Sequence, residues 1–163
     1  MIKPQALQKN STIGILSPSY WLDRKILSIT SKYFTDLGYR LKFGKSNELK
    51  WGPFAGLPEQ RADDIHEMFA NSDIDAIFCA RGGYGANRVL PLLDYNLIKE
   101  NPKIFIGYSD ITAMLTSITQ KTSLITFHGP MLTSYKDSWV EYNYSLMQRV
   151  LSGEKFIKIY SPD

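Results

Sequence analysis

The sequence predicts an α/β fold in which a doubly wound, mainly parallel sheet carries helices on both faces. Two observations support this prediction. Short apolar runs typical of strands alternate with longer segments whose apolar residues recur at helical spacing. Most of the strand candidates are largely apolar rather than alternating, as parallel strands are when both of their faces are buried. Sites in such sheets lie at the carboxyl ends of the strands.

The N-terminal part of the chain predicts the first β-α-β unit. Thr12–Ser17 is an apolar run that ends in a turn containing serine and proline. Apolar residues at helical spacing then predict a helix from Leu22 to Leu37, and Gly38 follows as a stop signal. Arg40–Phe43 alternates charged and apolar residues and is predicted to be the second strand.

A long loop from about Gly44 to Leu57 follows the second strand and contains the aromatic residues Trp51 and Phe54. Loops of this length usually have a role, and an aromatic one beside a site could cover it. Pro58 suits the first position of the next helix, where its missing N–H group costs nothing.

The rest of the chain predicts three further strand and helix pairs. The strand candidates are Ala76–Ala80, Lys103–Gly107 and Leu124–Phe127, and the helix candidates are Ala86–Leu93, Ile111–Ile118 and Trp139–Leu151. Five units of this kind favour a flavodoxin-like arrangement. A last segment, Lys155–Tyr160, alternates like a half-exposed strand.

Composition limits the possible functions. The chain has 163 residues, a net charge of +3 and no block of basic residues, so we expect no nucleic-acid partner. Its single cysteine, Cys79, lies in an apolar run and is expected to be a buried, inert thiol. Cysteine and histidine are too few for a structural zinc site. No segment is predicted to span a membrane or to act as a signal peptide, so we expect a cytoplasmic location without a membrane partner.

The segment Gly107–Asp110 carries the strongest chemical signal. It joins a strand candidate to a helix candidate, and a serine on such a turn projects its hydroxyl above a helix N-terminus, as in a nucleophile elbow. The match is incomplete because Ile111 stands where that motif has glycine, and a serine that merely caps the helix is the alternative. The Asp110 side chain is expected to complement the helix dipole.

A second turn, Arg81–Gly85, follows the preceding strand and contains three glycines. Glycine lets the backbone adopt left-handed conformations and approach a ligand closely. Two adjacent turns of this kind can place N–H groups opposite the Ser109 hydroxyl, as an oxyanion hole requires. A phosphate-binding loop and a plain tight connection are the alternatives, although the glycine spacing matches no phosphate motif.

Several stretches together resemble one family of serine peptidases. They are Ile15–Ser19, Phe54–Gly56, Arg61–Ile65, Arg81–Gly85, Pro102–Thr112 and Thr126–Met131. In this order and spacing the chain resembles the LD-carboxypeptidase family, which includes murein tetrapeptide LD-carboxypeptidase and the microcin C self-immunity protein. The resemblance covers essentially the whole chain.

The resemblance implies a cytoplasmic hydrolase that cleaves the amide between an L-centre and a terminal D-amino acid. The family's usual substrate is a murein tetrapeptide during cell-wall recycling, and a peptide-nucleotide amide of the microcin type is the alternative. Ser109 aligns with the family nucleophile. The backbone N–H groups of Asp110 and Gly83 align with its oxyanion hole, with Gly82 as the other candidate donor. The resemblance implies no metal, no organic cofactor and a homodimer when the protein is complete.

Four residues beside the two turns are candidates for substrate binding: Arg81, Gly82, Tyr84 and Tyr108. The guanidinium of Arg81 suits a substrate carboxylate, with a structural ion pair as the alternative. The tyrosines are expected either to line the pocket or only to pack. His128 follows the fifth strand candidate, but the family draws its base from elsewhere, so a structural or pocket-lining role is favoured.

Members of this family have a second, C-terminal domain that supplies the Glu and His of the triad. We therefore interpret residues 1–152 as the nucleophile-bearing N-terminal α/β domain. Residues 153–163 are interpreted as a linker or first strand towards a C-terminal domain absent from this chain. Alone, the chain is expected to be nearly inactive because Ser109 lacks its base. A non-catalytic ligand-binding or assembly module is the alternative class of function.

Overall fold

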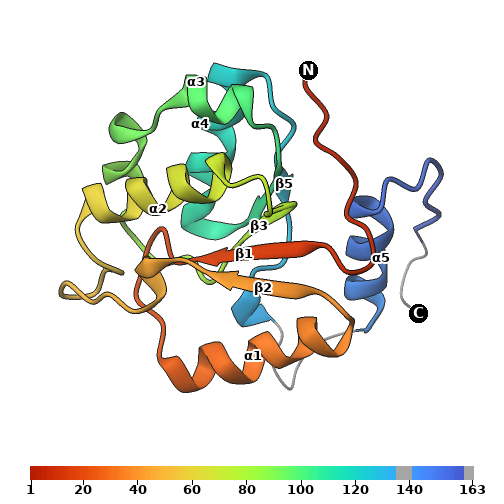
Figure 1. Cartoon of the computed structure of the whole chain (residues 1–163), viewed down its shortest axis with the longest axis horizontal. Coiled ribbons are helices and arrows are strands. Elements are labelled where there is room, and N and C mark those ends of the chain that lie inside the picture. The colour runs from red at the N-terminus through yellow and green to blue at the C-terminus, as the bar shows by residue number, and fades with distance from the viewer. Residues whose placement is uncertain (135–140, 160–163) are drawn as a thin grey trace.

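The fold is known from a computed structural model that describes residues 1–134 and 141–159. Its parallel strands form one sheet in the order β2-β1-β3-β4-β5, the flavodoxin-like order (Figure 1). The strands are β1 (Thr12–Leu16), β2 (Arg40–Phe43), β3 (Ala76–Cys79), β4 (Ile104–Gly107) and β5 (Phe127–His128). The predicted fold class is therefore confirmed. The chain steps outward from β1 to β2 and then crosses back to β3, so the topological switch point lies between β1 and β3.

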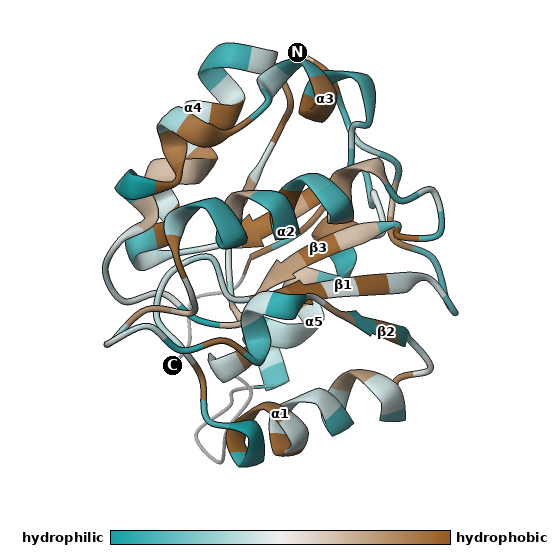
Figure 2. Ribbon diagram, turned by 60° about the vertical axis from the view of Figure 1, so that its left-hand side comes forward, coloured by the Kyte–Doolittle hydropathy of each residue, from teal (hydrophilic) through white to brown (hydrophobic). Residues whose placement is uncertain are grey.

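Helices cover both faces of this sheet. They are α1 (Arg24–Asp36), α2 (Pro58–Ala70), α3 (Tyr95–Glu100), α4 (Thr112–Thr122) and α5 (Glu141–Leu151). One apolar core lies between the sheet and α2, α3 and α4, and a second lies between the sheet and α1 and α5. Figure 2 shows that β1 and β3 are hydrophobic, as expected of strands covered by helices on both faces, whereas β2, at the edge of the sheet, is largely hydrophilic. None of the helices in the described ranges is both long and apolar enough to cross a membrane.

Local sequence signals explain where the first two helices begin and end. Asp23 caps α1 by accepting a hydrogen bond from the N–H of Lys25 at 2.8 Å, and Gly38, with a φ of +88°, follows its end. Pro58 is the first residue of α2, as predicted, and the Gln60 side chain accepts a hydrogen bond from the Leu57 N–H at 2.9 Å.

The helix predicted for Ala86–Leu93 is wrong. Two short 3₁₀ turns, Ala86–Arg88 and Leu90–Leu92, occupy this stretch. Pro91 is the physical reason, since it has no N–H with which to continue an α-helix. The true helix, α3, starts after Asp94. The carboxylate of Asp94 accepts hydrogen bonds from the backbone N–H groups of Asn96 and Leu97 at 3.0 Å each.

The last part of the chain also differs from the prediction. Strand β5 is shorter than expected, because Leu124 and Ile125 pair instead with Ile2 at the N-terminus. The strand predicted for Lys155–Tyr160 is absent over residues 155–159, where the Phe156 side chain is 87% exposed, and Tyr160 lies outside the described residues. Helix α5 is confirmed from Glu141 onward, and the start predicted at Trp139 also lies outside them.

Cys79 is expected to resist thiol reagents for as long as the chain is folded. It lies on β3, is completely buried as predicted, and burial raises the pKa of its thiol, which lowers the thiolate fraction. We expect labelling by an aromatic disulfide to proceed only at the rate at which the chain opens, and to become fast in denaturant. Rapid labelling in native buffer, with circular dichroism unchanged, would contradict this burial.

Candidate functional site

Ser109 lies on the sharp turn that joins β4 to α4, at the carboxyl edge of the sheet. Its φ angle is +61°, a left-handed conformation that is uncommon for a residue with a side chain. The strained turn predicted for a nucleophile elbow is therefore confirmed. The Ser109 side chain is exposed and forms no hydrogen bond with any residue in the described ranges, so it is not the cap of this helix.

The glycine-rich turn lies directly against Ser109, as predicted, because β3 and β4 are neighbours in the sheet. A Cβ atom added to Gly82 would lie 3.2 Å from the Cβ of Ser109 and 3.4 Å from its Oγ. Gly83 has a φ of +133°, and a Cβ there would lie 2.5 Å from Cγ of Tyr20. Only glycine therefore fits at position 83 against Tyr20, and a side chain at position 82 would press on Ser109.

Three backbone N–H groups around Ser109, those of Gly82, Gly83 and Asp110, have no hydrogen-bond acceptor among residues 1–134 and 141–159. The N–H of Asp110 also belongs to the first turn that leads into α4, where the helix dipole favours negative charge. Unsatisfied donors beside a strained serine are the arrangement that stabilises an oxyanion.

A pocket of about 360 Å³ opens in front of this serine. Three of the four predicted substrate-binding residues, Arg81, Gly82 and Tyr108, line it, together with Gly83 and Ser109. Leu22, Ile26 and Met131 add apolar walls. Tyr84 is not among the lining residues; it is 58% exposed, and its ring lies 6.3 Å from the ring of Phe54.

Arg81 is anchored only weakly within the pocket wall. One of its guanidinium nitrogens donates to the Trp21 carbonyl oxygen at 3.4 Å, and the guanidinium lies 5.6 Å from the ring of Tyr20. No carboxylate within the described ranges forms an ion pair with it. The structural ion pair that was the alternative for Arg81 is therefore not observed there, and most of its donors are available to a ligand.

The two histidines are not in the Ser109 pocket. His128 lies at the end of β5, with its ring 6.4 Å from that of Tyr108, and lines a separate apolar groove of about 540 Å³. His66, on α2, accepts a hydrogen bond from the backbone N–H of Asp94 at 2.9 Å through its Nε2. Neither histidine is hydrogen-bonded to Ser109.

The Asp110 side chain lies in the first turn that leads into α4, as predicted. It also accepts hydrogen bonds from the Oγ of Ser19 and, at 2.9 Å, from the backbone N–H of Ala86, which the sequence did not indicate. Arg61 of α2 is also unexpected, because it is completely buried and donates to the carbonyl oxygens of Pro18 and Gly85 at 2.8 and 3.0 Å. These partners are distant in sequence and follow no local motif.

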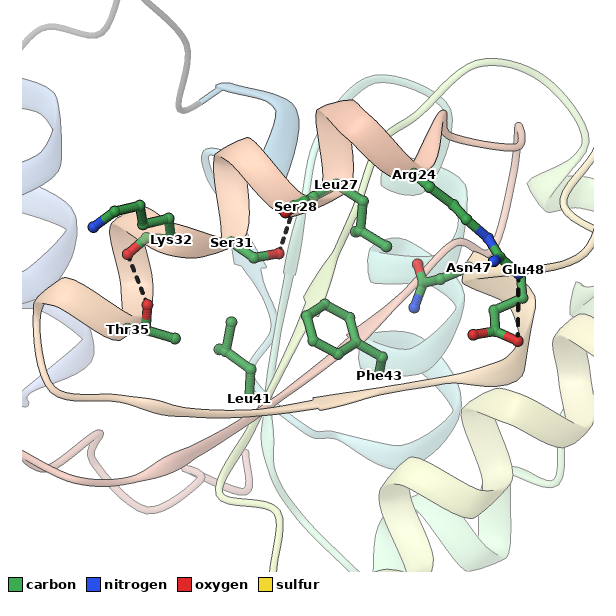
Figure 3. A pocket seen from close by; sticks show the side chains of 10 residues that line it. All are labelled: Arg24, Leu27, Ser28, Ser31, Lys32, Thr35, Leu41, Phe43, Asn47 and Glu48. Atoms are coloured by element: carbon green, nitrogen blue, oxygen red, sulfur yellow. Dashed lines mark hydrogen bonds and ion pairs between the residues drawn. The ribbon is translucent and has the colours of Figure 1, made fainter.

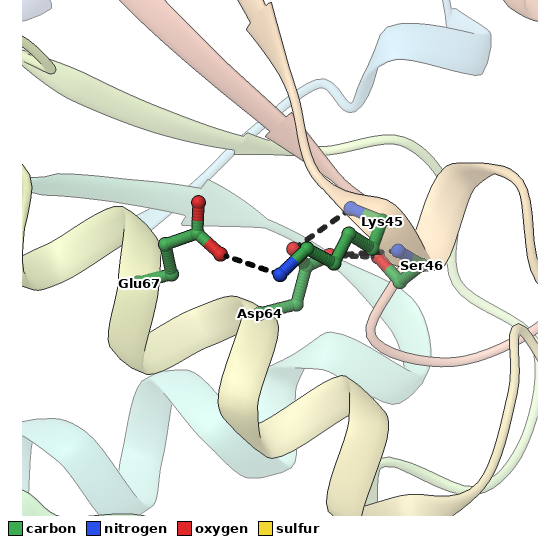
Figure 4. Close-up of polar contacts among 4 residues, drawn as sticks. All are labelled: Lys45, Ser46, Asp64 and Glu67. Atoms are coloured by element: carbon green, nitrogen blue, oxygen red, sulfur yellow. Dashed lines mark hydrogen bonds and ion pairs between the residues drawn. The ribbon is translucent and has the colours of Figure 1, made fainter.

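A second polar cluster holds the loops after β1 and β2 together. Asp64 accepts hydrogen bonds from the backbone N–H groups of Lys45 and Ser46 at 2.9 and 3.0 Å and from the Ser46 hydroxyl, as Figure 4 shows. The Ser46 hydroxyl oxygen in turn accepts from the Ser17 N–H at 2.9 Å. Lys45 also pairs with Glu67 at 3.2 Å. Arg61 and Asp64, one helical turn apart, thus fix the turn after β1 from α2.

Asp64 is expected to make the chain less stable as the pH rises. Burial raises the pKa of this carboxyl above its ordinary value of 3.8, although the hydrogen bonds from Ser46 and Lys45 oppose the shift. The folded chain therefore binds this proton more tightly than the unfolded chain. The stabilisation is complete below pH 3.8 and is lost as the pH rises through the folded-state pKa.

Asp64→Asn, which cannot titrate, is the variant that isolates this effect. Urea unfolding of both proteins at several pH values between about 4 and 7 should show the advantage of the wild type shrinking as the pH rises. A difference in unfolding free energy that stays constant across this range would contradict the prediction.

A larger hollow, of about 600 Å³, lies between α1 and the edge strand β2 (Figure 3). Leu27 and Phe43 face each other across it, and Arg24 pairs with Glu48 at 3.8 Å on its rim. None of the predicted site residues lines this hollow. It lies on the flank of the sheet, away from the switch point, and we assign it no role.

Gly83→Ala is expected to lower the free energy of unfolding by about 2–3 kcal/mol, because the new Cβ would be strained and would meet the root of the Tyr20 side chain. Gly52→Ala is the matched control, since Gly52 also has a positive φ, +57°, but has open space around it. Gly52→Ala should lower the free energy of unfolding by about 1 kcal/mol. Equal losses in urea unfolding of the two variants would contradict the close packing at Gly83.

Comparison with known proteins identifies relatives of this chain. The profile of the LD-carboxypeptidase N-terminal domain matches residues 13–129. The "Probable murein peptide carboxypeptidase" of Bacillus subtilis is 43% identical over 132 residues, which are 81% of this chain and 41% of that protein. The "Microcin C7 self-immunity protein MccF" of Escherichia coli is 45% identical over 95 residues, which are 58% of this chain and 28% of that protein.

A solved structure shows the same fold. The crystal structure of an MccF-like protein from Bacillus anthracis superposes on this chain with a TM-score of 0.88 at 34% identity, and the match covers 93% of this chain and 47% of that one. The chain therefore spans less than half the length of each of these three relatives.

Proposed function

Because the chain belongs to the LD-carboxypeptidase family, we propose that it is the nucleophile-bearing domain of a serine peptidase that removes a terminal D-amino acid from an L-centre. The observation that carries this proposal is the strained Ser109, with a φ of +61°, beside the unsatisfied N–H groups of Gly83 and Asp110. Strain of this kind persists where the surrounding structure enforces it, and functional sites are where it is most often found.

In the proposed reaction, the Ser109 hydroxyl attacks the carbonyl carbon of the scissile amide while a base removes its proton. The N–H groups of Gly83 and Asp110, or of Gly82 in place of Gly83, stabilise the negative oxygen of the tetrahedral intermediate. The C–N bond then breaks, and the leaving amine of the D-amino acid takes up the proton. Water hydrolyses the resulting ester and regenerates Ser109.

The triad's Glu and His are proposed to come from a C-terminal domain, as the family resemblance implies. The unbonded hydroxyl of Ser109 supports this, since within the described ranges no histidine or carboxylate contacts it. We assign residues 1–152 to the nucleophile-bearing domain and residues 153–163 to the connection between the domains. A homodimer and a cytoplasmic location are part of the same proposal.

We propose that Arg81 binds the free carboxylate of the substrate. It lines the Ser109 pocket and stands just before Gly82 and Gly83 in the sequence, and its guanidinium has donors to spare. A carboxypeptidase needs a cation at this place, because the terminal carboxylate lies one residue beyond the scissile carbonyl. Gly82 and Tyr108 complete the wall, whereas Tyr84 is a weaker candidate because it is not a lining residue.

The proposed substrate is a murein tetrapeptide that loses D-alanine in cell-wall recycling, in keeping with the name of the Bacillus subtilis relative. The alternative substrate is a peptide-nucleotide amide, which the likeness to the Escherichia coli microcin C7 self-immunity protein favours. A module that binds such peptides without cleaving them is the non-enzymatic alternative.

A serine-directed fluorophosphonate tests whether Ser109 is a nucleophile. The chain is incubated with the probe and imidazole, which supplies an external base, and peptide mass spectrometry locates the adduct. We expect Ser109 to be labelled well ahead of Ser28, an exposed serine of α1, and labelling of the peptide to vanish in Ser109→Ala. Equal labelling of Ser28 and Ser109 would contradict the proposal and leave the binding module as the better explanation.

A further inference from the structure

The carboxylate of Asp110 joins three loops at the carboxyl edge of the sheet. One of its oxygens, Oδ2, accepts a hydrogen bond from the Ser19 hydroxyl, in the turn after β1, and another from the Ala86 N–H at 2.9 Å, after β3. Ser19 and Ala86 are both completely buried. Hydrogen bonds to a carboxylate are stronger than those between neutral groups, particularly where water is excluded.

Arg61 also ties the same two loops together. Its guanidinium donates to the carbonyl oxygens of Pro18 and Gly85, the residues that precede Ser19 and Ala86 in the chain. The nearby Asp110 carboxylate opposes the lowering of the Arg61 pKa that burial causes, so the two charges attract each other. The turn after β1 is therefore bonded to both Asp110 and Arg61, and so is the end of the glycine-rich turn.

The backbone held by these bonds takes left-handed conformations on both sides of the pocket. Gly83 and Gly85, with φ angles of +133° and +112°, adopt them without strain, whereas Ser109, with a φ of +61°, is strained. A strained conformation of this kind persists only when its surroundings over-determine it. Within the described ranges, the bond from the Ala86 N–H to Asp110 is the hydrogen bond that joins the glycine-rich turn to the start of α4, because the N–H groups of Gly82 and Gly83 have no acceptor there.

We infer that the carboxylate of Asp110, together with Ser19, is a positioning group that sets Ser109 and the two oxyanion donors at their working separation. This inference rests on the function proposed above. Asp110 then acts twice, with its backbone N–H toward the oxyanion and its side chain locking the loops behind it. The carboxylate is not a base for Ser109, since within the described ranges it bonds to Ser19 and Ala86 and not to the Ser109 hydroxyl.

The test measures formation of a tetrahedral adduct at Ser109. The probe is N-acetyl-L-alanine boronic acid, in which boron replaces the scissile carbonyl carbon, and binding to the chain is followed by ¹¹B NMR. Asp110→Ala should weaken binding about 10- to 100-fold, because a displacement of about 1 Å suffices for such a loss. Asp110→Asn should restore most of the affinity, since its amide oxygen can accept the same two bonds. Ser19→Ala, which removes one bond, should fall between them.

Lys103→Met controls for a general loss of stability. Lys103 is a buried cation that donates to the carbonyl oxygens of Met68 and Asn71 at the end of α2, away from the Ser109 pocket. This variant should unfold at a lower urea concentration yet bind the boronic acid as the wild type does. If it loses as much affinity as Asp110→Ala, the positioning role is overturned.

The outcomes separate the two proposals. Absence of an adduct in the wild type, or an adduct that persists in Ser109→Ala, contradicts the proposed function itself. Binding that requires Ser109 but is equal in the wild type and in Asp110→Ala leaves the proposed function standing and overturns the positioning role. If Asp110→Ala does not fold, the affinity of Ser19→Ala for the boronic acid tests the positioning role instead. Wild-type affinity in Ser19→Ala would then overturn the inference.

Discussion

Residues 1–163 alone are expected to release D-alanine from a murein tetrapeptide at a rate roughly 10³-fold or more below that of a complete serine peptidase. A serine hydroxyl is a poor nucleophile at neutral pH without an adjacent base. The hydroxyl of Ser109 has no hydrogen-bond partner in the described ranges. Loss of the base therefore removes nearly all of the catalysis that the triad supplies, and Ser109→Ala should change the residual rate little.

His128→Ala is the informative control for this assay, because His128 is the histidine nearest in the fold to the Ser109 turn through its contact with Tyr108. It lines the apolar groove beyond β4 rather than the Ser109 pocket. D-alanine release should therefore be the same in this variant as in the wild type. Robust turnover by the chain alone that His128→Ala abolishes would identify His128 as the base and overturn the proposal of a second domain.

Arg61→Met is expected to lower the free energy of unfolding by about 3 kcal/mol or more. The substitution keeps an apolar stem beside the Phe54 ring, which lies 5.4 Å from the guanidinium, but it removes both bonds to buried carbonyl oxygens. It also leaves the carboxylate of Asp110 without the nearby positive charge. Domains of this size are stable by only about 5–15 kcal/mol, so the loss is large.

Arg88→Met is the matched control for Arg61→Met. The guanidinium of Arg88 lies 5.1 Å from the same Phe54 ring, but the residue is exposed and has no hydrogen bond to a buried carbonyl. Its substitution should change the unfolding free energy by less than about 1 kcal/mol. If urea unfolding gives similar losses for the two variants, the bonds of Arg61 to Pro18 and Gly85 do not stabilise the fold as we describe.

The parts of the fold that could be predicted depend on local signals. Strand β2 over Arg40–Phe43, the start of α2 at Pro58 and the end of α1 before Gly38 follow from residue alternation, a missing N–H group and a left-handed glycine. The segments that were predicted wrongly depend on residues distant in the sequence or, over Ala86–Leu93, on Pro91. Strand β5 is shortened because Ile2, at the other end of the chain, pairs with Leu124.

The candidate site could be predicted as far as topology determines it. Parallel strands bring the ends of β3 and β4 to one edge, and this alone places Gly82 beside Ser109. The positions of side chains could not be predicted in the same way. Asp110 lies 91 residues from Ser19 in the sequence, and no pattern in the sequence links them. Arg61 sits among charged residues of α2, so its complete burial carries no sequence signal.

The position of the oxyanion relative to Ser109 is the most direct test of the proposed site. A crystal structure of the chain with N-acetyl-L-alanine boronic acid would show it. We predict a bond between boron and the Oγ of Ser109, with one boronate oxygen about 2.7–3.1 Å from the backbone nitrogens of both Asp110 and Gly83, or of Gly82 in its place. An adduct whose oxygens face away from the glycine-rich turn, or boron bonded at another residue, would contradict the assignment of Ser109 and its two donors.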